Sequence, residues 1–181
     1  MGNRLISVKT AVAIVIGAVL MFLLMRFIAV PSGVRNTSLN LGIAVLSIFA
    51  AIYGPLAGLL IGFIGHTLND LTLGRISWSW VLAEALYGFV VGFLWKSYRL
   101  EEGRFGVKQA LLFNTVQVVA NMLAWVAVAP YLSTHIYHES AEIEYLQGLA
   151  AVVLDIAVVL ILGTPFLFIY SGNMAKSLRS T

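Results

Sequence analysis

The sequence has no cysteine, which excludes disulfide bridges, thiolate metal sites and a thiol nucleophile. Charged residues are scarce: they make up 10% of the 181 positions, whereas hydrophobic residues make up 60%. Soluble globular domains carry about 25% charged residues, and a soluble core in a chain of this size could not bury so many apolar side chains. The composition therefore predicts a protein embedded in the lipid bilayer. The net charge of +3 is modest and does not indicate a nucleic-acid surface.

Familiar enzyme motifs are absent as well. The sequence contains no phosphate-binding glycine-rich loop with lysine, no G-x-S-x-G and no H-E-x-x-H. No segment between the apolar runs is long enough to hold an ATPase domain. We therefore expect a chain that is not an enzyme, needs no cofactor and does not itself hydrolyse ATP.

Apolar segments follow one another along the whole sequence and predict an all-α fold. A bilayer core requires roughly 20 apolar residues in a helix, and only the second segment is clearly shorter. Pro165 lies inside the last segment and predicts a kink. The sequence thus predicts one transmembrane domain, residues 1–181, with six transmembrane helices in one bundle. The segments are 8–30, 39–53, 55–73, 78–95, 107–128 and 145–170.

The first segment could instead be a signal peptide, because Arg4 and Lys9 precede its apolar part. Its apolar stretch is long, and no A-x-A-like cleavage site precedes the polar loop that follows. A membrane span is therefore the favoured interpretation of this segment.

Lysine and arginine are unevenly distributed between the two ends of the predicted bundle. Six spans place both termini on one side with the loop near residue 100, and this side holds eight of the 11 basic residues. Because cytoplasmic loops carry an excess of Lys and Arg, we expect a multi-pass membrane protein with both termini in the cytoplasm. The loop with Glu139, Glu142 and Glu144 would then lie outside. The three basic residues of the outer side are Arg26, Arg35 and Arg75.

Glycines recur at four-residue intervals in two neighbouring segments. Gly54, Gly58 and Gly62 lie in the third segment, and Gly88 and Gly92 lie in the fourth. Small residues at this spacing allow helix backbones to approach closely in lipid. We expect these glycines to pack helices together within the chain.

Polar side chains inside the spans predict a binding pocket. Ionisable residues within a membrane are costly and are functional candidates by default. Glu84 lies about 9 Å below the outer end of its predicted helix, and Asn121 and Asp155 lie about 10–15 Å deep, at a rise of 1.5 Å per residue. Gln117 and Asn114 share a helical face with Asn121. These groups predict a pocket open to the outside.

Tryptophans accompany the polar groups, as in many sites for small flat molecules. Trp78 and Trp125 are the candidate stacking partners. Two alternatives remain open: Glu84 and Asp155 could form a structural hydrogen-bond network, or they could relay protons. His66 and Asp70 have the spacing of metal ligands, but two ligands do not make a site, so no metal is expected. His135 and His138 are expected to be solvated loop residues.

Three stretches of the sequence resemble a known family. They are residues 26–38 (RFIAVPSGVRNTS), 53–70 (YGPLAGLLIGFIGHTLND) and 78–92 (WSWVLAEALYGFVVG). They are similar to the substrate-binding S components of energy-coupling factor (ECF) vitamin transporters, and the similarity extends more weakly over most of the chain. Within the family, the chain is most similar to the subgroup assigned to hydroxymethylpyrimidine (HmpT-like).

The resemblance implies a six-helix bundle in the plasma membrane of a bacterial cell that binds a vitamin from outside. It also implies two kinds of partner, a transmembrane coupling protein (EcfT-like) and two cytoplasmic ABC ATPases. An A-x-x-x-A pattern in the first helix docks on the coupling protein in this family; here Ala13 matches, and Gly17 stands in the place of the second alanine. By position alone, the family's pocket carries over to Asn36, Glu84, Asn121 and Asp155.

The main hypothesis is a membrane subunit that captures a small ring-containing vitamin or precursor for ATP-driven uptake. Hydroxymethylpyrimidine, a thiamine precursor, and pyridoxine-like rings are the expected substrates, with riboflavin as the alternative. A stand-alone proton-coupled carrier that uses Glu84 and Asp155 is a second hypothesis, although no inverted repeat is visible in the sequence. An intramembrane enzyme is a third, and it lacks a plausible set of nucleophile and base.

Overall fold

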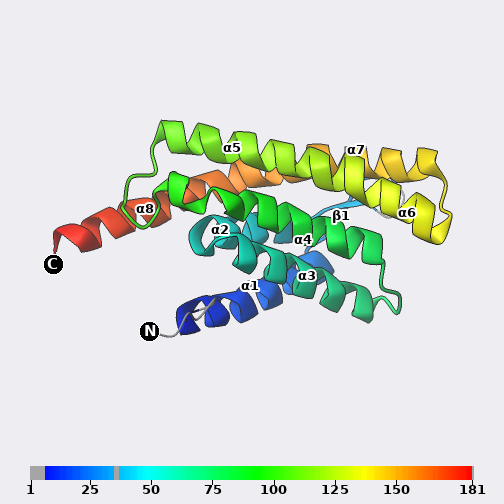
Figure 1. The fold of residues 1–181 in the computed structure, drawn as a ribbon, viewed down its shortest axis with the longest axis horizontal. Coiled ribbons are helices and arrows are strands. Elements are labelled where there is room, and N and C mark those ends of the chain that lie inside the picture. Colours follow the sequence, from blue (N-terminus) through cyan, green and yellow to red (C-terminus); the bar gives the residue numbers. More distant parts are fainter. Residues whose placement is uncertain (1–6, 35–36, 181) are drawn as a thin grey trace.

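Figure 1 shows the computed structural model, which describes residues 7–34 and 37–180. The described residues form six helical rods and a very short β-hairpin. The first four rods are single α-helices, and the last two each consist of two α-helices joined by a π-helical segment. The first four helices are α1 (Val8–Phe27), α2 (Gly42–Tyr53), α3 (Pro55–Thr72) and α4 (Trp78–Phe93).

The fifth rod is longer than the sequence predicts. It runs through α5 (Val107–Asn121), the π-helical segment η2 (Met122–Val128) and α6 (Ala129–Tyr137). The predicted end at residue 128 is therefore wrong, and Pro130 lies inside the rod. Proline lacks an N–H and crowds the carbonyl one turn earlier. Because the π-helical segment before it shifts the hydrogen-bond pattern, the helix continues past Pro130.

The sixth rod also exceeds its predicted bounds. It consists of α7 (Ala141–Val158), the π-helical segment η3 (Val159–Gly163) and α8 (Thr164–Arg179), and Pro165 again follows the π-helical segment directly. Glu142 and Glu144, which the sequence analysis placed in an external loop, are in the first turn of α7. Carboxylates are favourable there because they face the positive end of the helix dipole.

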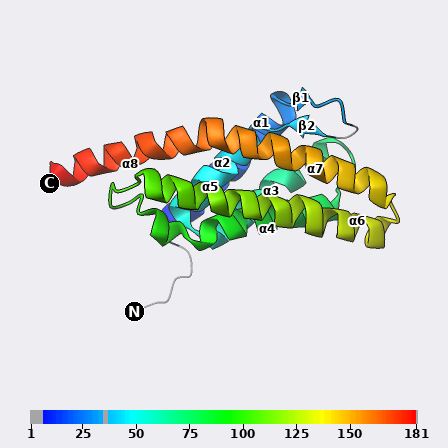
Figure 2. The ribbon, with the colours of Figure 1, turned by 90° about the horizontal axis from the view of Figure 1, so that it is seen from above.

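Two short elements complete the described structure. A 3₁₀ turn, η1 (Trp95–Tyr98), follows α4. The segment after α1 forms an antiparallel hairpin in which β1 (Val30–Pro31) pairs with β2 (Ser38–Leu39). Figure 2 shows this hairpin beside the α1 end and over α7, and β2 contacts α7.

Three of the described helices are long and apolar enough to cross a membrane: α1, the fifth rod of 31 residues and the sixth rod of 39 residues. The helices α2 and α4 are apolar but shorter. The outer surface agrees with a lipid environment, because large apolar side chains such as Val15, Leu111, Val153 and Ile161 are between 63% and 69% exposed. The structure thus supports an all-α, membrane-embedded fold.

Glycines bring α3 and α4 into backbone contact, as the sequence predicts. A Cβ atom added to Gly58 would collide with the carbonyl of Gly88, and one added to Gly88 would collide with the carbonyl of Gly58. Gly62 faces the backbone of Glu84 in the same way, and Gly92 faces Gly54. The approach of these two helices sets the position of Glu84 relative to the side chains of α3.

Ala13 and Gly17 do not form an outward-facing surface. Ala13 is 5% exposed, and a Cβ atom on Gly17 would lie 2.7 Å from Ile61 Cδ1 and 3.0 Å from Phe49 Cδ1. The small face of α1 therefore packs on α2 and α3 inside the bundle. The expectation that this pair contacts a partner protein is corrected, because the chain itself covers both residues.

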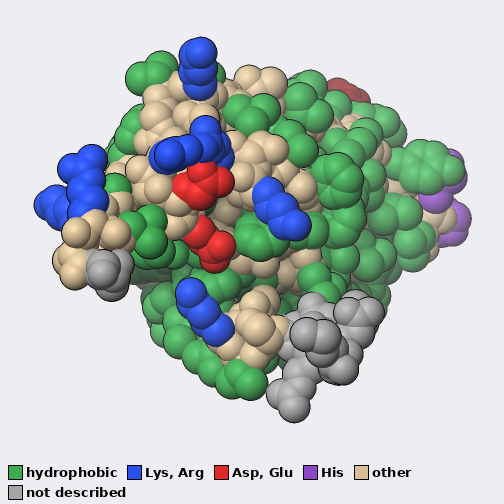
Figure 3. All heavy atoms as spheres, turned by 60° about the vertical axis from the view of Figure 1, so that its left-hand side comes forward, with side chains coloured by type: hydrophobic (Ala, Val, Ile, Leu, Met, Phe, Trp, Pro, Cys, Tyr) green, Lys and Arg blue, Asp and Glu red, His purple; other side chains and the backbone are tan. Residues whose placement is uncertain are grey.

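Basic side chains gather at the end of the bundle that carries both termini. Figure 3 shows Lys and Arg side chains around acidic side chains at this end. Arg99 donates two hydrogen bonds to Glu102 Oε2, at 2.9 and 2.6 Å, and these bonds hold the pKa of the Glu102 carboxyl below its ordinary value. The exposed basic residues here include Lys9, Lys96, Arg104, Lys108, Lys176 and Arg179.

Candidate functional site

A cavity of about 660 Å³ lies between the helices. Its walls come from the end of α1, residues 37–40, α3, α4, the η2–α6 part of the fifth rod and α7. The rim reaches Tyr137 and Glu139 at the turn between α6 and α7, the end of the bundle remote from both termini in Figure 1. Small-molecule sites typically measure about 300–1,000 Å³, so the cavity can hold a vitamin-sized ligand.

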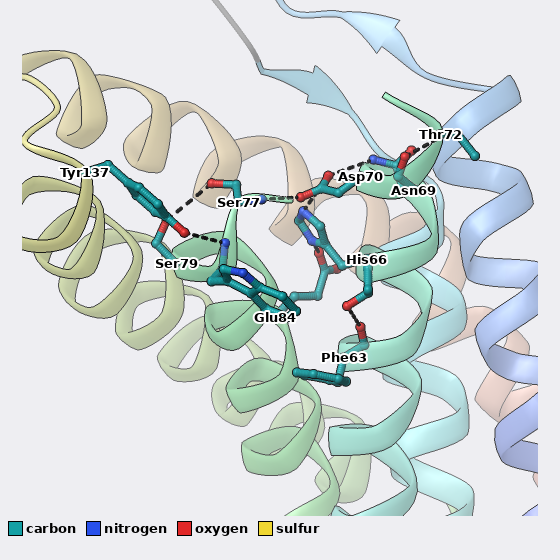
Figure 4. Close-up of polar contacts among 11 residues, drawn as sticks. Phe63, His66, Asn69, Asp70, Thr72, Ser77, Ser79, Glu84 and Tyr137 are labelled. Atoms are coloured by element: carbon teal, nitrogen blue, oxygen red, sulfur yellow. Dashed lines mark hydrogen bonds and ion pairs between the residues drawn. The ribbon is translucent and has the colours of Figure 1, made fainter. Parts of the chain in front are cut away.

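His66 of α3 joins two carboxylates in the wall of the cavity (Figure 4). Its Nδ1 lies 2.6 Å from Glu84 Oε2 of α4, and its Nε2 lies 3.5 Å from Asp70 Oδ1, one turn further along α3. Asp70 Oδ2 accepts a hydrogen bond of 2.9 Å from the backbone N–H of Ser77. The cluster therefore links α3, α4 and the connection between them.

Serine and tyrosine side chains extend the polar wall toward the rim. The hydroxyls of Ser79 on α4 and Ser133 on α6 are 2.7 Å apart. The Tyr137 hydroxyl accepts a hydrogen bond of 3.0 Å from the backbone N–H of Trp78, which fixes the start of α4 against α6. These contacts hold the outer ends of the two helices at a fixed spacing beside the cavity.

One face of α7 supplies the opposite wall. Glu144, Gln147, Ala151 and Asp155 line the cavity at intervals of three and four residues, as expected for one side of an α-helix. Glu144, Gln147 and Asp155 are between 4% and 7% exposed. A buried polar face on a helix of a membrane protein is costly unless it meets partners or a ligand.

Two indole rings lie between the walls. Trp80 of α4 and Trp125 of η2 stack with ring centroids 5.3 Å apart, and both line the cavity. The Trp80 N–H donates to Glu144 Oε2 at 3.3 Å. The Trp125 N–H faces the Asp155 carboxylate but lies outside hydrogen-bond geometry. The site thus combines aromatic surface with carboxylate acceptors.

The structure brings three of the predicted binding residues to this cavity. Glu84, Asp155 and Trp125 line it, although they come from α4, α7 and η2. Glu84 and Asp155, for which the sequence predicts depths of about 9 Å and about 10–15 Å, lie close enough in the structure to interact electrostatically.

The other predicted residues lie elsewhere. Asn121 and Gln117 are fully buried but do not line the cavity; the Asn121 Nδ2 donates to Gln117 Oε1 at 3.0 Å and to the Gln117 carbonyl at 2.9 Å. Trp78 is 43% exposed and stacks on Phe63 at 6.2 Å, outside the cavity. Asn36 lies outside the described residues.

Sequence reasoning did not assign four of the lining side chains to the site. His66, Asp70, Trp80 and Glu144 were not among the predicted binding residues: Asp70 was expected near the outer mouth of the pocket, Trp80 beside the polar helices and Glu144 in an external loop. The Glu144–Gln147–Asp155 spacing is a helical signal that an earlier start of the sixth segment would have shown. The pairing of His66 with Glu84 has no signal in the sequence, because it depends on how α3 and α4 are aligned.

The same residues do not form a metal site. Within the described ranges, no group of three or more His, Cys, Asp and Glu side chains is placed to hold a metal ion. Asp70 lies one turn further along α3 than His66, and Glu84 lies on α4, so the ligating atoms of the three side chains do not point toward one position. His135 and His138 lie at the far end of α6; contrary to the prediction of a loop, His135 is helical and its Nδ1 is 2.8 Å from the Tyr131 carbonyl oxygen.

Comparisons with known proteins agree on one family. The family model described as "ECF-type riboflavin transporter, S component" matches residues 5–172. A UPF0397 protein of Leuconostoc citreum is 44% identical over 181 residues, which cover 98% of this chain and 96% of that protein. A UPF0397 protein of Lactobacillus acidophilus is 42% identical over 177 residues, with coverage of 97% and 96%.

A third relative, a UPF0397 protein of Lacticaseibacillus casei, is 37% identical over 176 residues, which cover 97% of this chain and 95% of the relative. No solved structure is significantly similar to the chain. The match over nearly the whole length agrees with the apolar helices and the polar cavity between them. The chain therefore belongs to the family of ECF-type riboflavin transporter S components, the membrane substrate-binding subunits of ECF transporters.

Proposed function

We propose that this subunit captures a small ring-containing vitamin or vitamin precursor from outside the cell for ATP-driven uptake. The observation that carries the proposal is the composition of the cavity, where the stacked indoles of Trp80 and Trp125 lie beside the buried carboxylates of Glu84 and Asp155. A flat ring would lie against the aromatic surface, and its polar edge would meet the carboxylates.

Hydroxymethylpyrimidine, the thiamine precursor, or a pyridoxine-like ring is our proposed substrate. Both are small rings with hydrogen-bond donors, which suits a wall rich in acceptors. Riboflavin is the alternative, and the name of the matching family supports it. A cavity of about 660 Å³ has room for either kind of ring, so size alone does not choose between them.

The proposed transport arrangement has six spans with both termini in the cytoplasm. The basic end that carries the termini would face the cytoplasm, by the positive-inside rule, and the rim of the cavity would face outside. The subunit would join a transmembrane coupling protein and two cytoplasmic ABC ATPases, which would supply the energy. Family membership supports these partners.

Mass spectrometry of the ligand retained by the purified chain tests the proposal directly. We expect a pyrimidine, pyridine or flavin ring compound to be released on denaturation, and the same compound to bind the emptied protein in calorimetric titration. Retention of a ligand without a ring would refute the proposal. Co-purification of the chain with two ATPases and a coupling protein would test the proposed assembly.

A further inference from the structure

The cavity carries an unbalanced set of buried charges. Its wall includes four carboxylates that are 7% exposed or less, but His66 is the only buried basic side chain among the described lining residues. Arg26 and Arg75 lie exposed at the rim, and Arg75 pairs with Glu139 at 3.6 Å. The four buried carboxylates are Asp70, Glu84, Glu144 and Asp155.

Partners within the protein satisfy only some of these groups. Asp70 accepts from the Ser77 backbone, and Glu144 accepts from the Trp80 indole. Glu84 uses Oε2 for His66, but its Oε1 is buried and has no hydrogen-bond partner among the described residues. Asp155 lines the same cavity as Glu84, a group of the same charge, and lies close enough to interact with it electrostatically. Unused hydrogen-bond acceptors therefore remain in the part of the cavity wall that Glu84 and Asp155 form.

A buried carboxylate without a counter-charge is expensive, and two such groups facing each other are more so. A bound cation would relieve both costs. The absence of a convergent metal site among the described residues argues against a metal ion. The spread of acceptors over α4 and α7 suits an organic cation with several N–H donors, and the neighbouring indoles favour a flat, positively charged ring.

We infer that the site selects a cationic, N–H-donating heteroaromatic ring, bound with its donor edge toward the carboxylates of Glu84 and Asp155. This inference rests on the proposed function, because it assumes that the cavity of this chain is the substrate site. It also separates the two proposed substrates. An aminopyrimidine has an amino donor and a protonatable ring nitrogen, whereas the riboflavin ring system is neutral and rich in acceptors.

A matched pair of ligands tests the inference on the unaltered protein. The first is the amino form of hydroxymethylpyrimidine, and the second is its counterpart with a carbonyl oxygen in place of the amino group. Calorimetric titration at neutral pH should show that the amino compound binds roughly 10-fold to 100-fold more tightly, the usual effect of a hydrogen bond to a charged group. Riboflavin should bind no better than the carbonyl compound.

Substitutions of Glu84 and Asp155 should remove the preference for the amino compound. In Glu84→Gln and Asp155→Asn, the ratio of the affinity for the amino compound to that for the carbonyl compound should fall toward one, because the neutral amide no longer favours a cation. Glu102→Gln removes a carboxylate at the other end of the bundle and should leave the ratio unchanged. Equal or tighter binding of the carbonyl compound or of riboflavin to the unaltered protein would overturn the inference and leave the proposed uptake of a ring vitamin standing.

The retained ligand separates the remaining outcomes. If no ring compound binds but mass spectrometry identifies an organic cation without a ring, the proposed ring-vitamin function fails and the inference fails with it, because the inference requires a heteroaromatic ring. If the released ligand is neutral or anionic, the inference is wrong whatever its ring structure.

Discussion

At the scale of single residues, the two carboxylate oxygens of Glu84 differ in their contacts. Oε2 is held by His66 at 2.6 Å, whereas Oε1 is buried and has no hydrogen-bond partner among the described residues. The histidine fixes the orientation of the carboxylate, which lies in the wall of the cavity with unused acceptor capacity. Such preorganisation reduces the ordering cost of binding.

We predict that Glu84→Gln weakens ligand binding by about 1–3 kcal/mol, the cost of losing a hydrogen bond to a charged group. Glutamine preserves the shape of the side chain, so the fold should survive. Calorimetry on the purified variant measures the change, with Glu102→Gln as the control for removal of an acidic group. Unchanged affinity in Glu84→Gln would show that the ligand does not use this oxygen.

Asn121 should behave differently from Glu84. It is fully buried and bonded to Gln117, but it lies outside the lining of the cavity. We predict that Asn121→Ala lowers the free energy of unfolding by about 1–3 kcal/mol, because Gln117 loses its partner. Ligand affinity should stay close to that of the unaltered protein. Thermal unfolding in detergent measures the stability of Asn121→Ala, and calorimetry measures its ligand affinity. A loss of affinity as large as that in Glu84→Gln would contradict the placement of Asn121 outside the binding site.

The cost of burying polar groups made part of this site predictable from the sequence. Glu84 and Asp155 stand out because carboxylates are rare inside apolar spans, and both line the cavity. The same rule also selected Asn121 and Gln117, which bond to each other within one helix, although Gln117 Nε2 and Asn121 Oδ1 have no hydrogen-bond partner among the described residues. Distinguishing a polar group that faces a cavity from one that bonds its neighbour requires the rotation of each helix, which the sequence pattern leaves undefined.

At the scale of elements, the contact between α3 and α4 depends on glycines that face each other. We predict that Gly58→Ala destabilises the fold by about 1–3 kcal/mol, because a methyl group would meet the Gly88 carbonyl and force the backbones apart. Gly172→Ala in α8 is the control, since a Cβ atom there meets nothing within 4 Å and alanine favours helix. Thermal unfolding should separate the two variants, and equal stability would disprove the close approach.

Substitutions on two faces of α1 should have different consequences. Gly17→Leu places a large side chain against Ile61 and Phe49, so we expect loss of folded protein. Val15→Leu, at a position that is 63% exposed, should be tolerated. Size-exclusion chromatography in detergent checks both variants. A well-folded Gly17→Leu protein would return this face of α1 to the candidates for partner contact.

Helix starts could be predicted more accurately than helix ends in the last two rods. Apolar runs located Val107 as the start of the fifth rod, but Pro130 suggested an end that the structure does not have. In both long rods a π-helical segment comes directly before the proline-containing turn. Proline's effect on a helix depends on whether such a rearrangement is available, and no residue pattern in the sequence revealed it.

At the scale of the whole molecule, the two ends of the bundle differ in charge and in openness. The end with both termini exposes most of the lysines and arginines (Figure 3), whereas the rim of the cavity lies at the end formed by the turn between α6 and α7. The proposed capture from outside requires a cavity open to the outside, and the positive-inside rule predicts that the basic end lies in the cytoplasm. The two independent arguments give the same orientation.

Single-cysteine labelling tests this orientation, because the chain has no cysteine of its own. Glu142, in the first turn of α7, and Glu102, in the connection before α5, are both exposed and lie at opposite ends. On intact cells, a membrane-impermeant maleimide should label Glu142→Cys at once and Glu102→Cys only after the membrane is opened. Both positions are exposed to water, so neither substitution should disturb the apolar helices. Labelling of Glu102→Cys on intact cells would place the basic end outside, and the cavity rim would then face the cytoplasm, an orientation in which the site could not capture a substrate from the medium.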